Sequence, residues 1–254
     1  MTQLYRSLSR AFLGIGIAAI AVVPLRADDA PLAKLGPNAV PVTSDSNYLR
    51  NAPAPDYWAF ESFVKPQFTT SACSVAAVTG AVNGIRGLPS LAEETVTTQP
   101  QMLDLVGDEE WKTLSAEGGD GVSFAQLATF TTEAVAAAGL EGYRVESYKP
   151  KVANDTELTA LRGMLAANET SADDALLLYF NQGVVTGDWD GPHVSVIGAY
   201  DAEADRALIL EVDQEWYIPY WTPVPILLDA MLKPTSSEHG PLEGETGGFV
   251  HILK

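Results

Sequence analysis

A run of small apolar residues over 73–85 constrains the fold more than any other feature of this 254-residue chain. The cap-type residues 69–71 precede the run, and Gly87 and Pro89 follow it as stop signals. The run contains mostly valine, alanine and glycine, and it has no aromatic side chain. Because such a helix gains stability only through close contact with its neighbours, we expect it to be buried and central in the fold.

Helical patterns fall mainly in the first half of the chain, and strand patterns fall mainly in the second. The predicted helices cover 73–85, 100–105, 109–114, 123–138, 155–167 and 224–232. The predicted strands cover 143–148, 175–180, 193–200, 207–212 and 249–253. The polar turn 201–206 joins two of these strands as an antiparallel hairpin. Helices followed by an antiparallel sheet predict an α+β fold.

The charge and the composition exclude several classes of function. The chain has 33 acidic and 15 basic residues, a formal net charge of -18, and 46% hydrophobic residues. This balance fits one globular domain and argues against binding to nucleic acid or to anionic membrane surfaces. A single cysteine excludes an intrachain disulfide and a multi-cysteine metal site. The three histidines are too scattered for a zinc motif, so we expect no metal site on the chain.

The first 27 residues have the pattern of a secretory signal peptide. Arg6 and Arg10 precede an apolar run over 12–23, and Ala27 offers a small residue for cleavage. Residues 28–57 contain five prolines and read as a linker or loosely packed N-terminal arm, which leaves 58–254 as the main domain. We therefore expect a secreted or periplasmic protein without membrane contact after cleavage; an uncleaved N-terminal anchor is the alternative.

Cys73 stands at the first turn of the predicted small-residue helix. The N–H groups and partial positive charge of a helix start favour the thiolate, which is the reactive form of cysteine, and can hold an oxyanion. Gln67 lies six residues upstream and offers a side-chain amide as a second oxyanion donor. The alternatives are a buried structural thiol and an ordinary loop amide.

A cysteine nucleophile needs a base, and His193 at the start of a predicted strand is the candidate. Pairing Tyr200 with Arg206 across the hairpin places Asp213 opposite this histidine and Glu211 diagonal to it on the same face. A shift of one residue would move both acids to the other face. Glu211 is the acid that we expect to orient the imidazole, and Asp213 could substitute if the register differs. Alternatively, His193 is a core histidine and Glu211 a solvent-facing strand acid.

Several blocks of the chain resemble the phytochelatin synthase family, a group of papain-like cysteine enzymes that cleave glycine from glutathione. The matching blocks are Gln67-Phe-Thr-Thr-Ser-Ala-Cys73, Gly121-Val-Ser-Phe124, Gly191-Pro-His193-Val-Ser195, Ile197-Gly-Ala-Tyr200, Leu208-Ile-Leu-Glu211-Val and Gly248-Phe249. The resemblance covers roughly residues 57–254, and it implies a papain-like fold with the nucleophile on a central helix.

The resemblance also implies an activity and a role for each matching residue. Cys73 corresponds to the nucleophile, His193 to the base and Gln67 to the oxyanion donor. The implied reaction is that of a glutathione γ-glutamylcysteinyltransferase, in which a γ-Glu-Cys acyl-enzyme passes to water or to a second thiol peptide. Glutathione is the implied partner, Zn or Cd enters only as its thiolate complex, and a homodimer is expected by analogy.

The chain departs from the family at four positions. Glu211 stands where the family has Asp, and Ser74 replaces the Gly that follows the nucleophile. Gln214 and Gly247 stand where the family has two arginines suited to substrate carboxylates. The missing arginines leave open a related cysteine peptidase that acts on another small peptide. The first two departures leave open a non-catalytic binding protein with the same fold.

Overall fold

A seven-stranded antiparallel sheet forms the frame of residues 33–254, which are the part of the chain that the computed structural model describes. The strands lie in the order β1-β6-β5-β4-β3-β7-β2. Their bounds are β1 Val40–Pro41, β2 Arg144–Tyr148, β3 Ala175–Asn181, β4 Pro192–Asp201, β5 Arg206–Leu210, β6 Tyr220–Pro223 and β7 Gly248–Leu253. The predicted α+β class is confirmed, and the predicted signal peptide lies outside the described residues.

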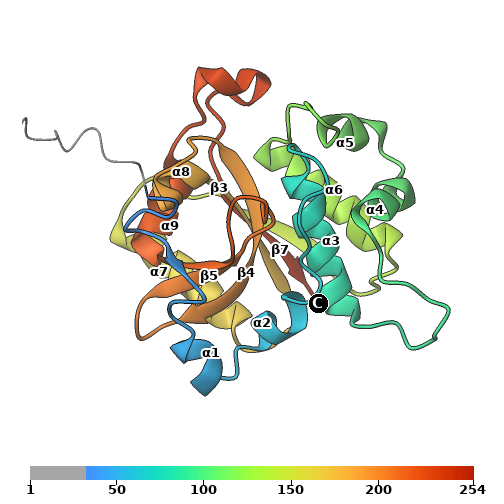
Figure 1. Ribbon diagram of the computed structural model, residues 1–254, viewed down its shortest axis with the longest axis horizontal. Coiled ribbons are helices and arrows are strands. Elements are labelled where there is room, and N and C mark those ends of the chain that lie inside the picture. Colours follow the sequence, from blue (N-terminus) through green and yellow to red (C-terminus); the bar gives the residue numbers. More distant parts are fainter. Residues whose placement is uncertain (1–32) are drawn as a thin grey trace, which may run out of the picture. The chain divides into compact units, whose positions relative to one another are not determined.

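Helices cover both faces of the sheet, as Figure 1 shows. The first group is α3 Cys73–Arg86, α4 Gln99–Val106, α5 Glu109–Leu114 and α6 Phe124–Ala137. The second group is α7 Asp155–Asn168, α8 Gln182–Thr186 and α9 Val224–Leu232. The central strand β3 is buried on both faces, because Leu177 and Tyr179 belong to the core beside α3 while Leu176 and Leu178 belong to the core beside α9.

The small-residue helix α3 is buried from its second to its eleventh residue, which confirms the predicted central helix. Its glycines are required by close packing, because a Cβ atom at Gly84 would collide with the ring of Phe60. That ring belongs to α2 (Pro55–Phe60), which packs against α3. A side chain larger than hydrogen at this position would separate the two helices.

The N-terminal segment over 33–57 is more regular than the predicted loosely packed arm. Residues 33–57 were predicted as part of a loosely packed arm, but they contain β1, α1 (Asn47–Asn51) and the first turn of α2. The prolines that suggested a linker occupy positions that regular structure tolerates. Pro41 lies in the edge strand β1, and Pro55 lies in the first turn of α2. Ala54 and Asp56 in this segment are fully buried.

The hairpin of β4 and β5 differs from the predicted register at its turn. Tyr200 lies opposite Ala207, one residue away from the predicted partner Arg206. A β-bulge within β4 takes up the difference, so that Val196 lies opposite Leu210, as the predicted register also required. The bulge therefore keeps the end of the hairpin near His193 in the pairing that the predicted register required.

Candidate active site

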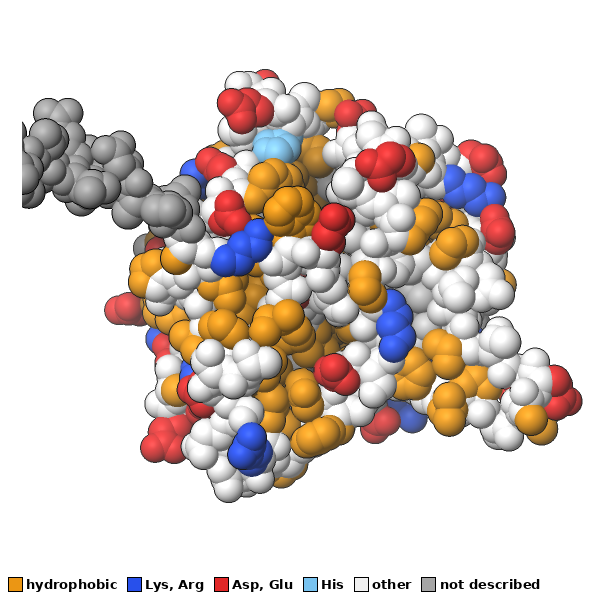
Figure 2. Space-filling model, in the orientation of Figure 1, with side chains coloured by type: hydrophobic (Ala, Val, Ile, Leu, Met, Phe, Trp, Pro, Cys, Tyr) orange, Lys and Arg blue, Asp and Glu red, His pale blue; other side chains and the backbone are white. Residues whose placement is uncertain are grey.

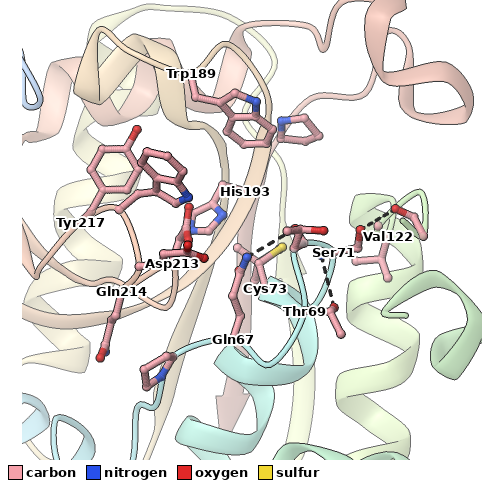
Figure 3. A pocket seen from close by; sticks show the side chains of 18 of the residues that line it. Gln67, Thr69, Ser71, Cys73, Val122, Trp189, His193, Asp213, Gln214 and Tyr217 are labelled. Carbon is pink, nitrogen blue, oxygen red and sulfur yellow. Dashed lines mark hydrogen bonds between the residues drawn. The ribbon is translucent and has the colours of Figure 1, made fainter. Parts of the chain in front are cut away.

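A pocket of about 650 Å³ opens where α3 begins beside β3 and β4. Gln67 and Cys73 from the segment that leads into α3, and His193 from β4, all line it (Figure 3). Asp213 lines the same pocket, whereas Glu211 lies behind its wall. The structure therefore brings together every residue that the sequence singled out for chemistry.

Cys73 is the first residue of α3 and is partly exposed in the pocket. The preceding residue, Ala72, has no side chain that caps the helix, and no other side chain of residues 33–254 takes that place. The N–H groups of the first turn therefore remain available to a ligand beside the sulfur. This arrangement can stabilise a thiolate and the oxyanion that forms when the thiolate attacks a carbonyl.

Gln67 is held next to Cys73 by its backbone. Its N–H donates to the carbonyl oxygen of Val212 at 2.8 Å, which ties the loop before α3 to the end of the sheet. Figure 3 shows its side-chain amide beside Cys73, where Nε2 also donates to the carbonyl of Thr70 at 3.3 Å. The amide can therefore donate to an oxygen that lies between it and the helix start.

His193 is the second residue of β4, and its ring is almost completely buried. Its Nε2 lies 2.6 Å from Oε1 of Glu211, which leaves Nδ1 as the ring nitrogen available to Cys73. Burial by itself lowers the pKa of His193, but the carboxylate of Glu211 and the side chain of Cys73 oppose this and raise the pKa above its ordinary value. The site therefore favours an imidazolium.

Glu211 is fully buried and follows β5 directly. Burial raises its pKa, but the imidazole of His193, the N–H of Asp213 and the hydroxyl of Tyr220 outweigh burial and lower it. Of the two candidate acids, Glu211 is the one in contact with the imidazole. Asp213 contributes its backbone N–H, which donates to Oε1 of Glu211 at 2.7 Å.

Three side chains around Glu211 were not found by sequence reasoning. Gln182 and Tyr220 donate to Oε2 of Glu211 at 2.9 and 3.0 Å, and the hydroxyl of Ser195 lies 3.2 Å from Nε2 of His193. Gln182 has no predicted role, and Tyr220 belongs to a group of aromatic residues over 216–221 whose pattern is typical of core packing. No local spacing signal links either residue to Glu211, because the contacts join separate elements of the sheet and α8.

Two departures from the family pattern have a structural account. Ser74 accepts a hydrogen bond at 3.0 Å from the indole nitrogen of the buried Trp111, so its hydroxyl is used in the core. Glu211 reaches the imidazole in spite of its extra methylene. Neither substitution therefore argues against a reactive cysteine.

The two missing arginines leave the pocket with little positive charge. Gln214 lines the pocket, and a side chain at Gly247 would collide with the carbonyl of Tyr179. Among the lining residues Lys34 is the one lysine or arginine, and its Nζ lies 4.3 Å from the ring centroid of Trp216. The lining acids are Glu117, Asp120, Asp188, Asp213 and Glu215.

The face of the molecule in Figure 2 is also more acidic than basic. Figure 2 shows acidic side chains spread over the molecule in this view, with few basic ones between them. This agrees with the 33 acidic and 15 basic residues of the chain. No group of three or more His, Cys, Asp or Glu side chains within residues 33–254 has the arrangement of a metal site.

Comparison with known sequences agrees with this geometry. A cysteine at the start of a buried helix, with an imidazole–carboxylate pair on an antiparallel sheet, defines a class of α+β proteins with a cysteine-centred site. Within this class, the chain belongs to the phytochelatin synthase family: the family model described as "Phytochelatin synthase" matches residues 33–240.

The curated relatives carry one functional name. Glutathione gamma-glutamylcysteinyltransferase 1 from Triticum aestivum is 33% identical over 125 residues, which are 49% of this chain and 23% of the relative. Glutathione gamma-glutamylcysteinyltransferases 2 and 1 from Arabidopsis thaliana are 32% and 30% identical, over 44% and 53% of this chain. The matches span 22% and 24% of those two relatives, so this chain matches about a quarter of each relative's length.

Proposed function

We propose that this protein is a cysteine enzyme that cleaves glycine from glutathione through a γ-Glu-Cys acyl-enzyme. The observation that carries the proposal is the placement of Cys73, His193 and Gln67 in one pocket, with Glu211 in contact with the imidazole. The family membership and the names of the curated relatives support glutathione as the substrate class.

The first half of the reaction forms a thioester. The thiolate of Cys73 attacks the carbonyl carbon of the Cys–Gly peptide bond, and the resulting oxyanion lies between the first-turn N–H groups of α3 and Nε2 of Gln67. His193, held as an imidazolium by Glu211, donates its proton to the nitrogen of glycine as the C–N bond breaks. Glycine leaves, and γ-Glu-Cys remains bound to Sγ of Cys73.

The second half of the reaction releases the acyl group. His193, now neutral, takes a proton from a water molecule or from the amino group of a second thiol peptide as that nucleophile attacks the thioester carbonyl. Water gives free γ-Glu-Cys, and a second glutathione gives a longer γ-Glu-Cys oligomer. Zn or Cd would enter with the second glutathione as a thiolate complex, so the metal belongs to the substrate and not to the chain.

The test uses the fact that Cys73 is the one cysteine in the chain. Wild type and Cys73→Ser are incubated with glutathione, glycine release is measured, and mass spectrometry of the quenched protein detects the γ-Glu-Cys adduct. We expect glycine release and an adduct from wild type and neither from the variant. A folded wild-type protein that releases no glycine would reject glutathione as the substrate.

A second candidate substrate is a small thiol peptide with fewer free carboxylates than glutathione. The acidic lining of the pocket, with Lys34 as its one lysine or arginine and with Gln214 and Gly247 in place of arginines, favours this alternative. Comparing kcat/KM for glutathione with that for its C-terminal amide tests the point. We expect the amide to be the better substrate under the alternative and the free acid under the first proposal.

We further propose that the protein is exported after cleavage behind Ala27 and acts in a periplasmic or extracellular compartment. The charged and apolar pattern of residues 1–27 supports this. Within residues 33–254, no helix is long and apolar enough to cross a membrane. Amino-terminal sequencing of the protein recovered from the periplasmic fraction should begin at Asp28. Recovery with the uncleaved segment in the membrane fraction would favour an anchor instead.

A further inference from the structure

The carboxylate of Glu211 is more completely hydrogen-bonded than contact with His193 requires. Four donors lie within 3.0 Å of its two oxygens. Oε1 receives Nε2 of His193 and the backbone N–H of Asp213, while Oε2 receives Nε2 of Gln182 and the hydroxyl of Tyr220. One oxygen therefore faces the imidazole, and the other is held by two neutral side chains.

These two side chains act on the site from behind the wall of the pocket. Gln182 begins α8 and is 1% exposed, and Tyr220 begins β6 and is 0% exposed. Neither is among the described residues that line the pocket, so neither is placed to touch a substrate there. Any influence on the chemistry has to pass through Glu211 and His193.

The contacts of Oε2 also depend on the length of the side chain at position 211. An aspartate at position 211 would be shorter by one methylene, about 1.5 Å. If its carboxylate kept the contact with His193, it would withdraw from the hydroxyl of Tyr220 and the amide of Gln182. Two buried donors would then lose their acceptor, and an unsatisfied buried polar group is costly.

We propose that Gln182 and Tyr220 are positioning residues that hold Oε2 of Glu211, aim Oε1 at His193, and make glutamate the required acid in this chain. The proposal deepens the proposed function, since it concerns the same site. It makes a separate statement, however, about the reactivity of Cys73, which can be measured without any substrate.

The first test measures the rate at which iodoacetamide alkylates Cys73 between pH 5.5 and 9 in the folded full-length chain. Loss of the Tyr220 hydroxyl destabilises the Glu211 carboxylate, which weakens the imidazolium and returns its proton to the sulfur. We expect Tyr220→Phe to slow alkylation at pH 6 by about tenfold and Gln182→Met to slow it similarly, as for the loss of a hydrogen bond to a charged group. Both variants should approach the wild-type rate at pH 9.

Tyr48→Phe is a matched control. Its hydroxyl also donates to a partly buried glutamate, Glu169, at 3.0 Å, but neither residue lines the catalytic pocket. We expect this variant to keep the wild-type alkylation profile within a factor of two. If Tyr220→Phe gave the same unchanged profile as Tyr48→Phe, the hydroxyl of Tyr220 would be a packing feature and the proposal would be overturned.

A double-mutant cycle tests why the acid is a glutamate. Tyr220→Phe should slow alkylation strongly in the wild-type background and less than twofold in Glu211→Asp, because the shorter acid no longer reaches the hydroxyl. Equal effects in both backgrounds would show that side-chain length and the Tyr220 contact are independent. Circular dichroism confirms that each variant is folded, and Gln182→Met in the same cycle provides a second determination if Tyr220→Phe does not fold.

The failure of this proposal can be distinguished from the failure of the proposed function. Absence of glycine release by wild type, together with pH-dependent alkylation that requires Tyr220, would reject glutathione and keep the positioning role. Glycine release by wild type that Tyr220→Phe and Gln182→Met leave unchanged, with unchanged alkylation, would keep the function and reject the positioning role.

Discussion

Glu211 beneath the catalytic pocket and Asp56 in α2 are both 0% exposed, yet their surroundings differ. The carboxylate of Glu211 has four donors within 3.0 Å, one of them an imidazole. The carboxyl of Asp56 has the amide of Asn168 as a partner for one oxygen, and its Oδ1 has no hydrogen-bond partner within the described residues.

The pKa values of the two carboxyl groups consequently shift in opposite directions. For Glu211, burial is outweighed and the pKa is lowered. For Asp56, burial together with the negative charges of Glu169 and Asp174 raises the pKa to about 9. The comparison teaches that the neighbouring charges and donors supplied by the fold, and not the depth of burial alone, determine whether a buried acid is charged. Only the charged one lies next to a histidine.

The largest expected effect is a loss of activity that distinguishes Glu211 from Asp56. Glu211→Gln removes the charge that supports the imidazolium, and we expect glycine release to fall by at least about 100-fold. Asp56→Asn removes a group that is neutral in the folded protein and remote from the pocket, so kcat/KM should stay within about twofold. Equal losses of activity in the two folded variants would show that Glu211 and Asp56 do not differ in their effect on the site.

The next effect concerns stability as a function of pH. The folded chain keeps the proton of Asp56 up to about pH 9, whereas the unfolded chain releases it near the ordinary value of 3.8. Because unfolding releases this proton, the group lowers the free energy of unfolding as pH rises between these values, by up to about 1.4 kcal/mol per pH unit. Asp56→Asn removes this contribution.

Calorimetry at pH 5 and pH 8.5 measures this effect. The Tm of Asp56→Asn relative to wild type should rise between the two pH values. A Tm difference for Asp56→Asn that is the same at both pH values would show that Asp56 is not held protonated in the folded chain.

A smaller effect should appear in the alkaline limb of the pH–rate profile. The pKa of His193 is raised, so the imidazolium that we propose as the proton donor to the leaving glycine persists above the ordinary range of a histidine. We therefore expect no loss of kcat/KM between pH 7 and pH 8 in wild type. In the residual activity of Glu211→Gln, the limb should move to lower pH, since the charge that raises the pKa is gone.

The smallest effect concerns Asp213, the acid that lines the pocket but does not contact the imidazole. Its backbone N–H, which bonds Glu211, is kept in Asp213→Asn. We expect this variant to change kcat/KM by less than about threefold, because a partly solvated charge acts weakly on His193. A loss as large as that of Glu211→Gln would instead make Asp213 the orienting acid.

Local signals in the sequence were sufficient for most of the fold. The cap-type residues and small side chains around 73–85 predicted α3, and the helix predicted over 123–138 is α6, which begins with a capping box of Ser123 and Gln126. The apolar run over 175–180 predicted the buried strand β3. These predictions hold because caps, helical periodicity and strand patterns depend on residues that are neighbours in the chain.

The sequence by itself determined the residue types of the site and the elements near which they lie: a cysteine at a helix start, a histidine at a strand start, and two acids near the end of the neighbouring strand. Only the tertiary structure decided that Glu211 and not Asp213 contacts His193, and that Gln182 and Tyr220 complete its hydrogen bonds. The reason is physical. A buried charge is stabilised by donors that the sheet order and a β-bulge bring together, and neither can be derived from spacing along the chain.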